Sequence, residues 1–229
     1  MYTLFHHPMY AGSRMVRLML GEYGIEAQFH EEPVWERREP FLDVNPAATL
    51  PVMAHFENPI IGAQVCVEYL EEVEGSKGSA PRLFPEDALT RAEMRRLIDW
   101  MLLKLETEVL RYIVRERVIK RLVPESQGGG PPDSQALRAA RTNIRYHLDY
   151  TDWLAGTRNW MAGDTLSCAD LAAAASLSVL DYLGEIRWED HAALKEWYAR
   201  MKSRPAFRPL LADRLRGIPP VSHYVDLDF

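Results

Sequence analysis

The sequence predicts a small α/β domain followed by a larger all-helical domain. Over roughly the first third of the chain, short apolar runs alternate with amphipathic helical runs, a pattern typical of an α/β unit. Beyond a polar, glycine-containing linker the apolar spacing is helical, which predicts helices packed on helices. We expect the α/β domain at 1–76, the linker at 77–86, the helical domain at 87–207 and a C-terminal extension at 208–229.

The α/β domain is expected to open with a strand, a helix and a second strand. Residues 2–6 form a short aromatic and apolar run, and residues 13–23 carry apolar side chains at helical spacing. Gly24 is placed to end this helix, because glycine enters the left-handed region without strain. Residues 25–30 suit a strand parallel to the first, reached by a right-handed crossover.

Two strands and a helix are expected to complete this domain. Residues 49–55 alternate like a strand, and Asn58-Pro59 marks a turn into another short strand. Residues 64–72 then have the apolar spacing of a short helix.

The helical domain is expected to contain one long helical stretch and three further helices. Residues 87–122 hold no Gly or Pro, and we expect one bend or break there because the stretch is long for a globular helix. Helices follow at 135–154 and 191–201, and the almost wholly apolar residues 167–183 predict a buried central helix. That helix begins with a capping-box pattern, Ser167-Cys168-Ala169-Asp170.

Composition narrows the classes of function. The chain has 229 residues and a formal net charge of −6, which argues against a nucleic-acid binder that works through bulk positive charge. Its cysteines, Cys66 and Cys168, cannot build a disulfide framework, which favours a reducing, cytoplasmic compartment. We expect no secretory leader, no membrane span and no metal site, because none of their patterns is present in the sequence.

Four short motifs, in this order of elements and spread over nearly the whole chain, resemble the glutathione transferase family. The resemblance implies a thioredoxin-like α/β domain, an all-α second domain, a cis peptide bond before Pro51 and a homodimer. The motifs are Ser13-Arg14-Met15-Val16-Arg17, Asn45-Pro46-Ala47-Ala48-Thr49-Leu50-Pro51-Val52, Gly163-Asp164 with Leu166-Ser167 and Ala169-Asp170, and Trp197-Tyr198 with Met201 and Arg204-Pro205.

The resemblance also implies where glutathione would bind. A hydroxyl at the start of the first helix would stabilise the thiolate, and Tyr10 and Ser13 are the candidates. Leu50 and Pro51 would hold the peptide part of the tripeptide.

A third element of this site is degenerate. The family holds the γ-glutamyl carboxylate with an acidic residue and a serine at a helix N-terminus, and this pair falls on Gly62 and Ala63. Each lost hydrogen bond to a charged group costs about 1.5–3 kcal/mol. We therefore expect weak glutathione binding.

The C-terminal extension resembles that of the transferase-like bacterial division proteins, which bind the tubulin homologue FtsZ. This resemblance implies FtsZ as a partner, the division site as the location, and an activity that requires no glutathione or other cofactor. Its candidate contacts are His223, Tyr224, Asp226 and Asp228, in a terminal segment dense in aromatic and acidic residues.

Two further side chains are candidate partner contacts. Arg115 belongs to a basic helical stretch in which it shares a face with Arg111, while Arg117 lies on another face; such a helix suits an acidic partner. Trp35 lies in a polar run, where an aromatic side chain is a good interaction anchor.

These observations leave three hypotheses open. The first is a non-catalytic homodimer that binds FtsZ and regulates its filaments, which the apolar pair Gly62 and Ala63 favours. The second is a glutathione-dependent transferase or isomerase with a weak or altered site, which the retained loop at 45–52 permits. The third is an interaction module with another partner.

Overall fold

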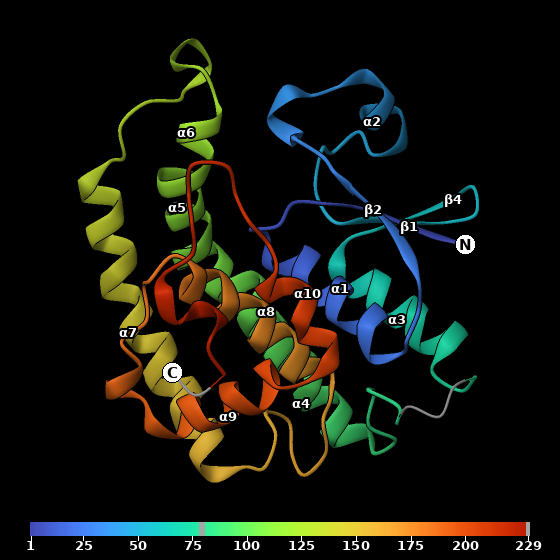
Figure 1. The fold of residues 1–229 in the computed structure, drawn as a ribbon. Helices are drawn as coiled ribbons and strands as arrows, with labels where there is room; N and C mark the ends of the chain where they lie inside the picture. The colour runs from blue at the N-terminus through green and yellow to red at the C-terminus, as the bar shows by residue number, and fades with distance from the viewer. Residues whose placement is uncertain (78–80, 228–229) are drawn as a thin grey trace.

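The computed structural model describes residues 1–77 and 81–227, so part of the predicted linker and the last two residues, Asp228 included, lie outside it. Figure 1 shows an α/β part packed against an all-helical part. The predicted fold class, a thioredoxin-like domain followed by an all-α domain, is confirmed. No helix in the described ranges is both long and apolar enough to cross a membrane.

The strands of the described residues form one sheet in the order β2-β1-β3-β4. β1 pairs with β2 in parallel, and β3 pairs antiparallel with both β1 and β4. The parallel pair requires a crossover, which α1 provides. The strands are β1 (Tyr2–His6), β2 (Ala27–Glu31), β3 (Val52–His55) and β4 (Asn58–Ile61).

Two helices, α1 (Ala11–Glu22) and α3 (Ala63–Glu74), cover one face of the sheet, and the short α2 (Glu39–Val44) lies at the other side. α1 begins two residues earlier than predicted. Gly24 follows its end with φ +64°, as the sequence predicted.

We expected one bend or break in the long helical stretch of the second domain, and the structure has no break there. The chain instead passes through three segments with the wider turns of a π-helix. These wider turns alter which side chains share a face of the helix. The segments are α4 (Ala88–Asp99), η2 (Trp100–Lys104), η3 (Glu106–Leu110), α5 (Arg111–Val114), η4 (Arg115–Ile119) and α6 (Lys120–Leu122).

The helix α8 (Cys168–Tyr182) is the centre of the helical domain, and every one of its residues is buried. The predicted capping box is present, because the Ser167 side chain accepts from the Ala169 amide while Asp170 accepts from the Ser167 amide at 3.0 Å. α7 (Ser134–Thr157) and α9 (Ala192–Lys202) pack against each other beside it.

The C-terminal extension joins the two domains. Its α10 (Arg208–Leu211) and η8 (Ser222–Val225) lie over α1 and α8. The fully buried Arg14 of α1 donates to the Tyr224 hydroxyl at 2.9 Å and to the Ser178 hydroxyl at 2.8 Å. Since a buried guanidinium needs partners, this hydrogen-bonded cluster ties the extension to both domains.

Candidate functional site

A cleft between the two domains contains the residues that the family resemblance selected. The first turns of α1 and α3 form one wall, and the long helical stretch forms the other. The cleft has two hollows, of about 390 Å³ and 330 Å³, and Tyr10 and Glu106 line both. We call the first hollow the acidic half, which is lined by Tyr10, Ala11, Gly12, Leu50, Ala63, Gln64, Ile98, Asp99, Leu102, Leu103 and Glu106. We call the second hollow the basic half, which is lined by Met9, Tyr10, Val34, Trp35, Arg37, Ala47, Ala48, Glu106, Arg111, Val114, Arg115 and Ile119.

The acidic half occupies the position expected for glutathione. Three of the predicted site residues, Tyr10, Leu50 and Ala63, meet there. The charged residues of its lining are Asp99 and Glu106, and none of the lining residues is Lys, Arg or His. Amides at the starts of α1 and α3 can donate to an anion, but the opposite wall presents carboxyl groups. The acidic side chains of this lining disfavour the binding of glutathione, because this tripeptide carries two carboxylates and reacts as a thiolate.

Tyr10 and Glu106 influence each other at the junction of the two halves. Burial raises the pKa of Glu106 to about 7, and the nearby Arg111 guanidinium opposes that rise. Burial also raises the pKa of Tyr10, as does the negative charge of Glu106. The Tyr10 hydroxyl therefore keeps its proton and can donate a hydrogen bond, but it lies beside a carboxyl group rather than beside a cation.

Ser13 is a different case, and its candidacy as a thiol-activating residue is wrong. The residue is fully buried and lies outside the lining of both hollows. Its hydroxyl accepts a hydrogen bond from the His7 amide at 3.4 Å. Ser13 lies in the third position of α1, whose N-cap is Tyr10, so its side chain points into the domain core.

The degenerate pair lies where the sequence placed it. Gly62 is the N-cap of α3 with φ +96°, and Ala63 is the first residue of the helix. The Gly62 amide donates to the Pro51 carbonyl at 3.0 Å, and the Leu50-Pro51 bond is cis, as the resemblance implied. The start of α3 and the cis bond therefore lie where they were expected, and neither Gly62 nor Ala63 has a polar side-chain atom that could hold a carboxylate.

The basic half brings together Trp35 and Arg115, which lie far apart in the sequence. Arg37 and Arg111 complete a set of three guanidinium groups, and these two form no ion pair with a carboxylate of the described residues. The Trp35 ring lies edge-on to the His7 ring at 5.6 Å between centroids. A hollow with three guanidinium groups and an indole ring suits a ligand with carboxylate and aromatic or aliphatic groups.

The predicted division of the basic helix between two faces is confirmed. Arg111 and Arg115 face the cleft, whereas Arg117 points away from it and pairs with Glu185 at 2.5 Å. Of these three side chains, Arg111 and Arg115 are therefore the ones available to a ligand in the cleft.

The terminal segment has one buried and two accessible candidates. Tyr224 is fully buried, so its expected role as a direct partner contact is wrong and its side chain instead anchors η8. His223 is half-buried and pairs with Asp181 at 3.1 Å. Asp226 is exposed, and its carbonyl accepts from the Lys202 ammonium group. Asp228 lies outside the described residues.

Glu106 was missed by the sequence reasoning, although the sequence contains a signal for it. It follows Leu102 by four residues and precedes Val109 by three, so an acidic residue lies on an apolar stripe of a helix. An acid in that position needs either a partner or a water-filled cleft. The structure provides the cleft.

Comparison with known proteins identifies the family models that match this chain and several similar proteins. Family models described as "Glutathione S-transferase, N-terminal domain" and "Glutathione S-transferase, C-terminal domain" match residues 12–73 and 108–205. The chain is 42% identical to FtsZ-localized protein A of Caulobacter vibrioides, over 99% of this chain and 98% of that protein.

Solved structures agree with this finding along the whole chain. A crystal structure of a glutathione S-transferase from Sinorhizobium meliloti matches with a TM-score of 0.98 and 55% identity, covering 100% of both chains. FzlA from C. crescentus matches with a TM-score of 0.92 and 41% identity, covering 100% of this chain and 99% of that one.

Proposed function

Because the chain belongs to the glutathione S-transferase family, we propose that it is a homodimer of this fold that binds FtsZ at the division site in the cytoplasm and regulates its filaments without glutathione chemistry. The support for the partner is the relative named FtsZ-localized protein A, which matches over almost the full length of both chains. A homodimer is typical of the fold.

The unequal charge of the two cleft halves carries the proposal. Asp99 and Glu106 oppose an anionic tripeptide in the acidic half, and the apolar Ala63 offers it no hydroxyl. Arg37, Arg111 and Arg115 face the basic half. This charge distribution favours recognition of an acidic protein surface over activation of a thiol.

The proposed contacts lie in two places. Trp35 and Arg115 would supply an aromatic anchor and a guanidinium group at the mouth of the cleft. His223 and Asp226 would contribute from the terminal segment, together with Asp228. Tyr224 would act indirectly, by holding this segment against the fold.

Co-sedimentation with FtsZ assembled in GTP tests the proposal. We expect the wild-type protein to pellet with the filaments and Arg115→Glu or Trp35→Ala to reduce the bound fraction about tenfold. Arg121→Glu is the matched control, because Arg121 is exposed on the same helical stretch and lies outside the lining of the cleft. Absence of wild-type protein from the pellet, with sedimentation velocity reporting a folded dimer, would contradict the proposal.

A glutathione-dependent transferase is the second candidate. It is favoured by the Tyr10 hydroxyl at the N-cap of α1 and by the retained cis bond before Pro51. Titration calorimetry with millimolar glutathione separates the candidates, because heat with a defined stoichiometry supports the second. No heat with a folded protein would support the first.

A further inference from the structure

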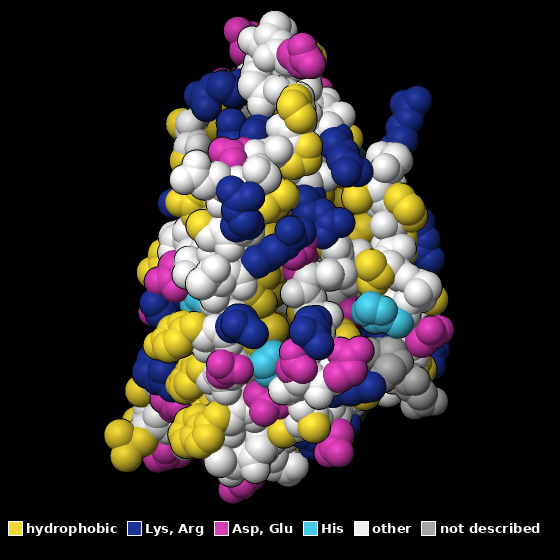
Figure 2. All heavy atoms as spheres, turned by 90° about the vertical axis from the view of Figure 1, so that its left-hand side faces the viewer, with side chains coloured by type: hydrophobic (Ala, Val, Ile, Leu, Met, Phe, Trp, Pro, Cys, Tyr) yellow, Lys and Arg dark blue, Asp and Glu magenta, His cyan; other side chains and the backbone are white. Residues whose placement is uncertain are grey.

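A further hollow lies on the helical domain, away from the cleft. It has a volume of about 840 Å³ and lies between α7 and the loop that follows α8. Figure 2 shows this face, on which Lys and Arg side chains are mixed with Asp and Glu side chains. The hollow shares no lining residue with either half of the cleft. Its lining consists of Arg141, Ile144, Arg145, Leu148, Asp149, Gly184, Glu185, Arg187, Asp190 and His191.

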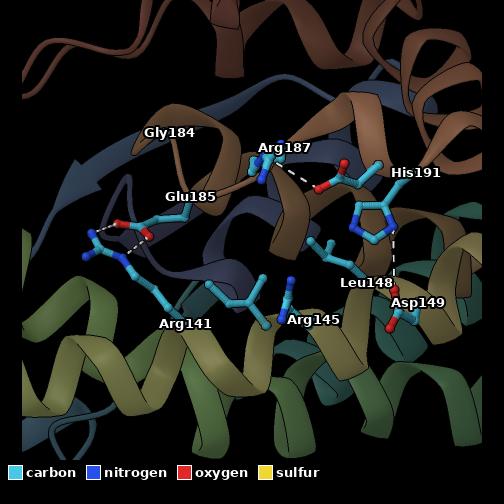
Figure 3. Close-up of a pocket in the computed structure, with 10 residues that line it drawn as sticks. Arg141, Arg145, Leu148, Asp149, Gly184, Glu185, Arg187 and His191 are labelled. Carbon is cyan, nitrogen blue, oxygen red and sulfur yellow. Dashed lines mark hydrogen bonds and ion pairs between the residues drawn. The ribbon is translucent and has the colours of Figure 1, made fainter.

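Arg145 is the cation of this hollow that lacks a partner. It is exposed and forms no ion pair with any carboxylate of the described residues. Figure 3 shows its side chain rising from α7 into the gap, with Arg187 on the opposite wall. Two guanidinium groups that face a shared space repel each other unless an anion lies between them. This arrangement favours a carboxylate ligand.

The acidic residues of the lining are engaged to different degrees. Glu185 accepts from Arg141 at 2.8 Å and also from Arg117 on its other side, so two guanidinium groups share one buried carboxylate. Arg187 pairs with Asp190 at 3.5 Å, but both side chains are exposed, so this pair is weak and replaceable. Asp149, the third acidic residue of the lining, is exposed and lies 3.8 Å from the His191 ring. Arg145 is therefore the arginine of the lining that has no ion pair among the described residues.

The floor of the hollow is apolar, so a ligand that fills the hollow needs an apolar group as well as an anionic one. Ile144 and Leu148 are buried and lie one turn apart on α7. A small anion has no apolar group to cover these side chains, whereas a peptide segment can place a carboxylate and an apolar side chain in the same hollow.

We propose that this hollow binds a short acidic peptide segment of a partner protein, with carboxylates on Arg145 and Arg187 and an apolar side chain over Ile144 and Leu148. The proposal goes beyond FtsZ binding and does not depend on it, because the two surfaces share no residue. Planar guanidinium groups suit such carboxylates, since each can donate two parallel hydrogen bonds.

Fluorescence anisotropy tests the proposal with a labelled octapeptide in which glutamate alternates with leucine. We expect the full-length wild-type protein to bind it, and to bind a glutamine–leucine octapeptide at least about tenfold more weakly. Arg145→Glu should weaken binding of the acidic peptide about tenfold. Arg208→Glu is the control with an equal change in charge, because Arg208 is exposed on α10 outside the hollow.

Three results would overturn the proposal. The first is equal affinity for the two peptides, which would mean that carboxylates are not recognised. The second is undiminished binding by an Arg145→Glu, Arg187→Glu double variant that folds like the wild type. The third is competition by free glutamate or inorganic phosphate as effective as competition by unlabelled peptide, which would identify a small-anion site.

Discussion

The two halves of the cleft differ in charge although they share Tyr10 and Glu106. The half that would receive glutathione presents Asp99 and Glu106, and its lining contains no cationic residue. The neighbouring half presents Arg37, Arg111 and Arg115 beside an indole ring. The cis bond before Pro51 and the start of α3 position the first half, and its lining offers an anion no cationic side chain. Two neighbouring hollows on one backbone scaffold can therefore differ in the charge of the ligand that they favour.

The largest expected effect concerns Glu106, at the boundary of the halves. Its pKa of about 7 lies above the ordinary value of 4.5, so the folded state holds the proton more tightly than the unfolded chain. This tighter proton binding stabilises the folded state. The stabilisation is fully present below the ordinary pKa of 4.5 and is lost as pH rises through about 7. From about pH 5 to about pH 8, Glu106→Gln should therefore gain about 2–3 kcal/mol in free energy of unfolding relative to wild type.

Urea denaturation at several pH values measures this gain. Asp99→Asn is the control, because this carboxyl belongs to the same half but is exposed to water. A free-energy difference between Glu106→Gln and wild type that is constant over the whole pH range would show that the Glu106 carboxyl is not desolvated in the cleft.

A second prediction restores a hydroxyl to the acidic half. Ala63→Ser, combined with Glu106→Gln, should strengthen glutathione binding about tenfold, because a hydrogen bond to the γ-glutamyl carboxylate is regained and a neighbouring charge is removed. Titration calorimetry provides the measurement. Ala47→Ser with Glu106→Gln places the same hydroxyl in the other half and should show no gain from the serine. Equal affinities for the two double variants would mean that Ala63 does not lie at the carboxylate position.

A third prediction concerns the backbone beneath the acidic half. Gly62 has φ +96° and Gly24 has φ +64°, and a Cβ atom at either would meet no neighbouring atom within 4 Å. Alanine at each position should therefore cost about 1 kcal/mol through backbone strain alone. Thermal unfolding measures the cost. Since only Gly62 adjoins the cleft, Gly62→Ala should also weaken glutathione binding, and an equal loss for Gly24→Ala would refute that assignment.

Much of the fold, but less of the cleft, could be predicted from the sequence. The apolar spacing and capping box placed α8 correctly, and motif order placed Tyr10, Leu50 and Ala63 on one wall. The sequence contains Glu106 on an apolar stripe but does not place it on the wall opposite Tyr10. The wider turns of η2 and η3 change the helical period, so a face inferred from the ordinary period is shifted there.

The terminal segment shows that burial near a chain end is hard to predict from the sequence. Aromatic residues near a chain end are compatible with exposure or with burial, and the outcome for Tyr224 depends on Arg14, which is 210 residues away. Ser13 was misplaced for a related reason, since a helix that begins two residues earlier turns the same side chain toward the core.

The smallest expected effect is the salt dependence of the basic half. Its guanidinium groups are exposed, so their attraction for an acidic partner is screened as the Debye length falls from about 14 Å to about 6 Å between roughly 0.05 M and 0.3 M salt. Wild-type binding to FtsZ filaments should weaken about threefold over this range. An Arg111→Gln, Arg115→Gln variant should bind more weakly and respond less to salt, because the screened charges are absent. FtsZ assembly itself responds to salt, so each co-sedimentation is paired with Arg121→Gln on the same filaments, which removes one exposed charge outside the cleft. The same salt response for the double variant and this control would place the electrostatic contact elsewhere on the molecule and leave the basic half without a role in binding.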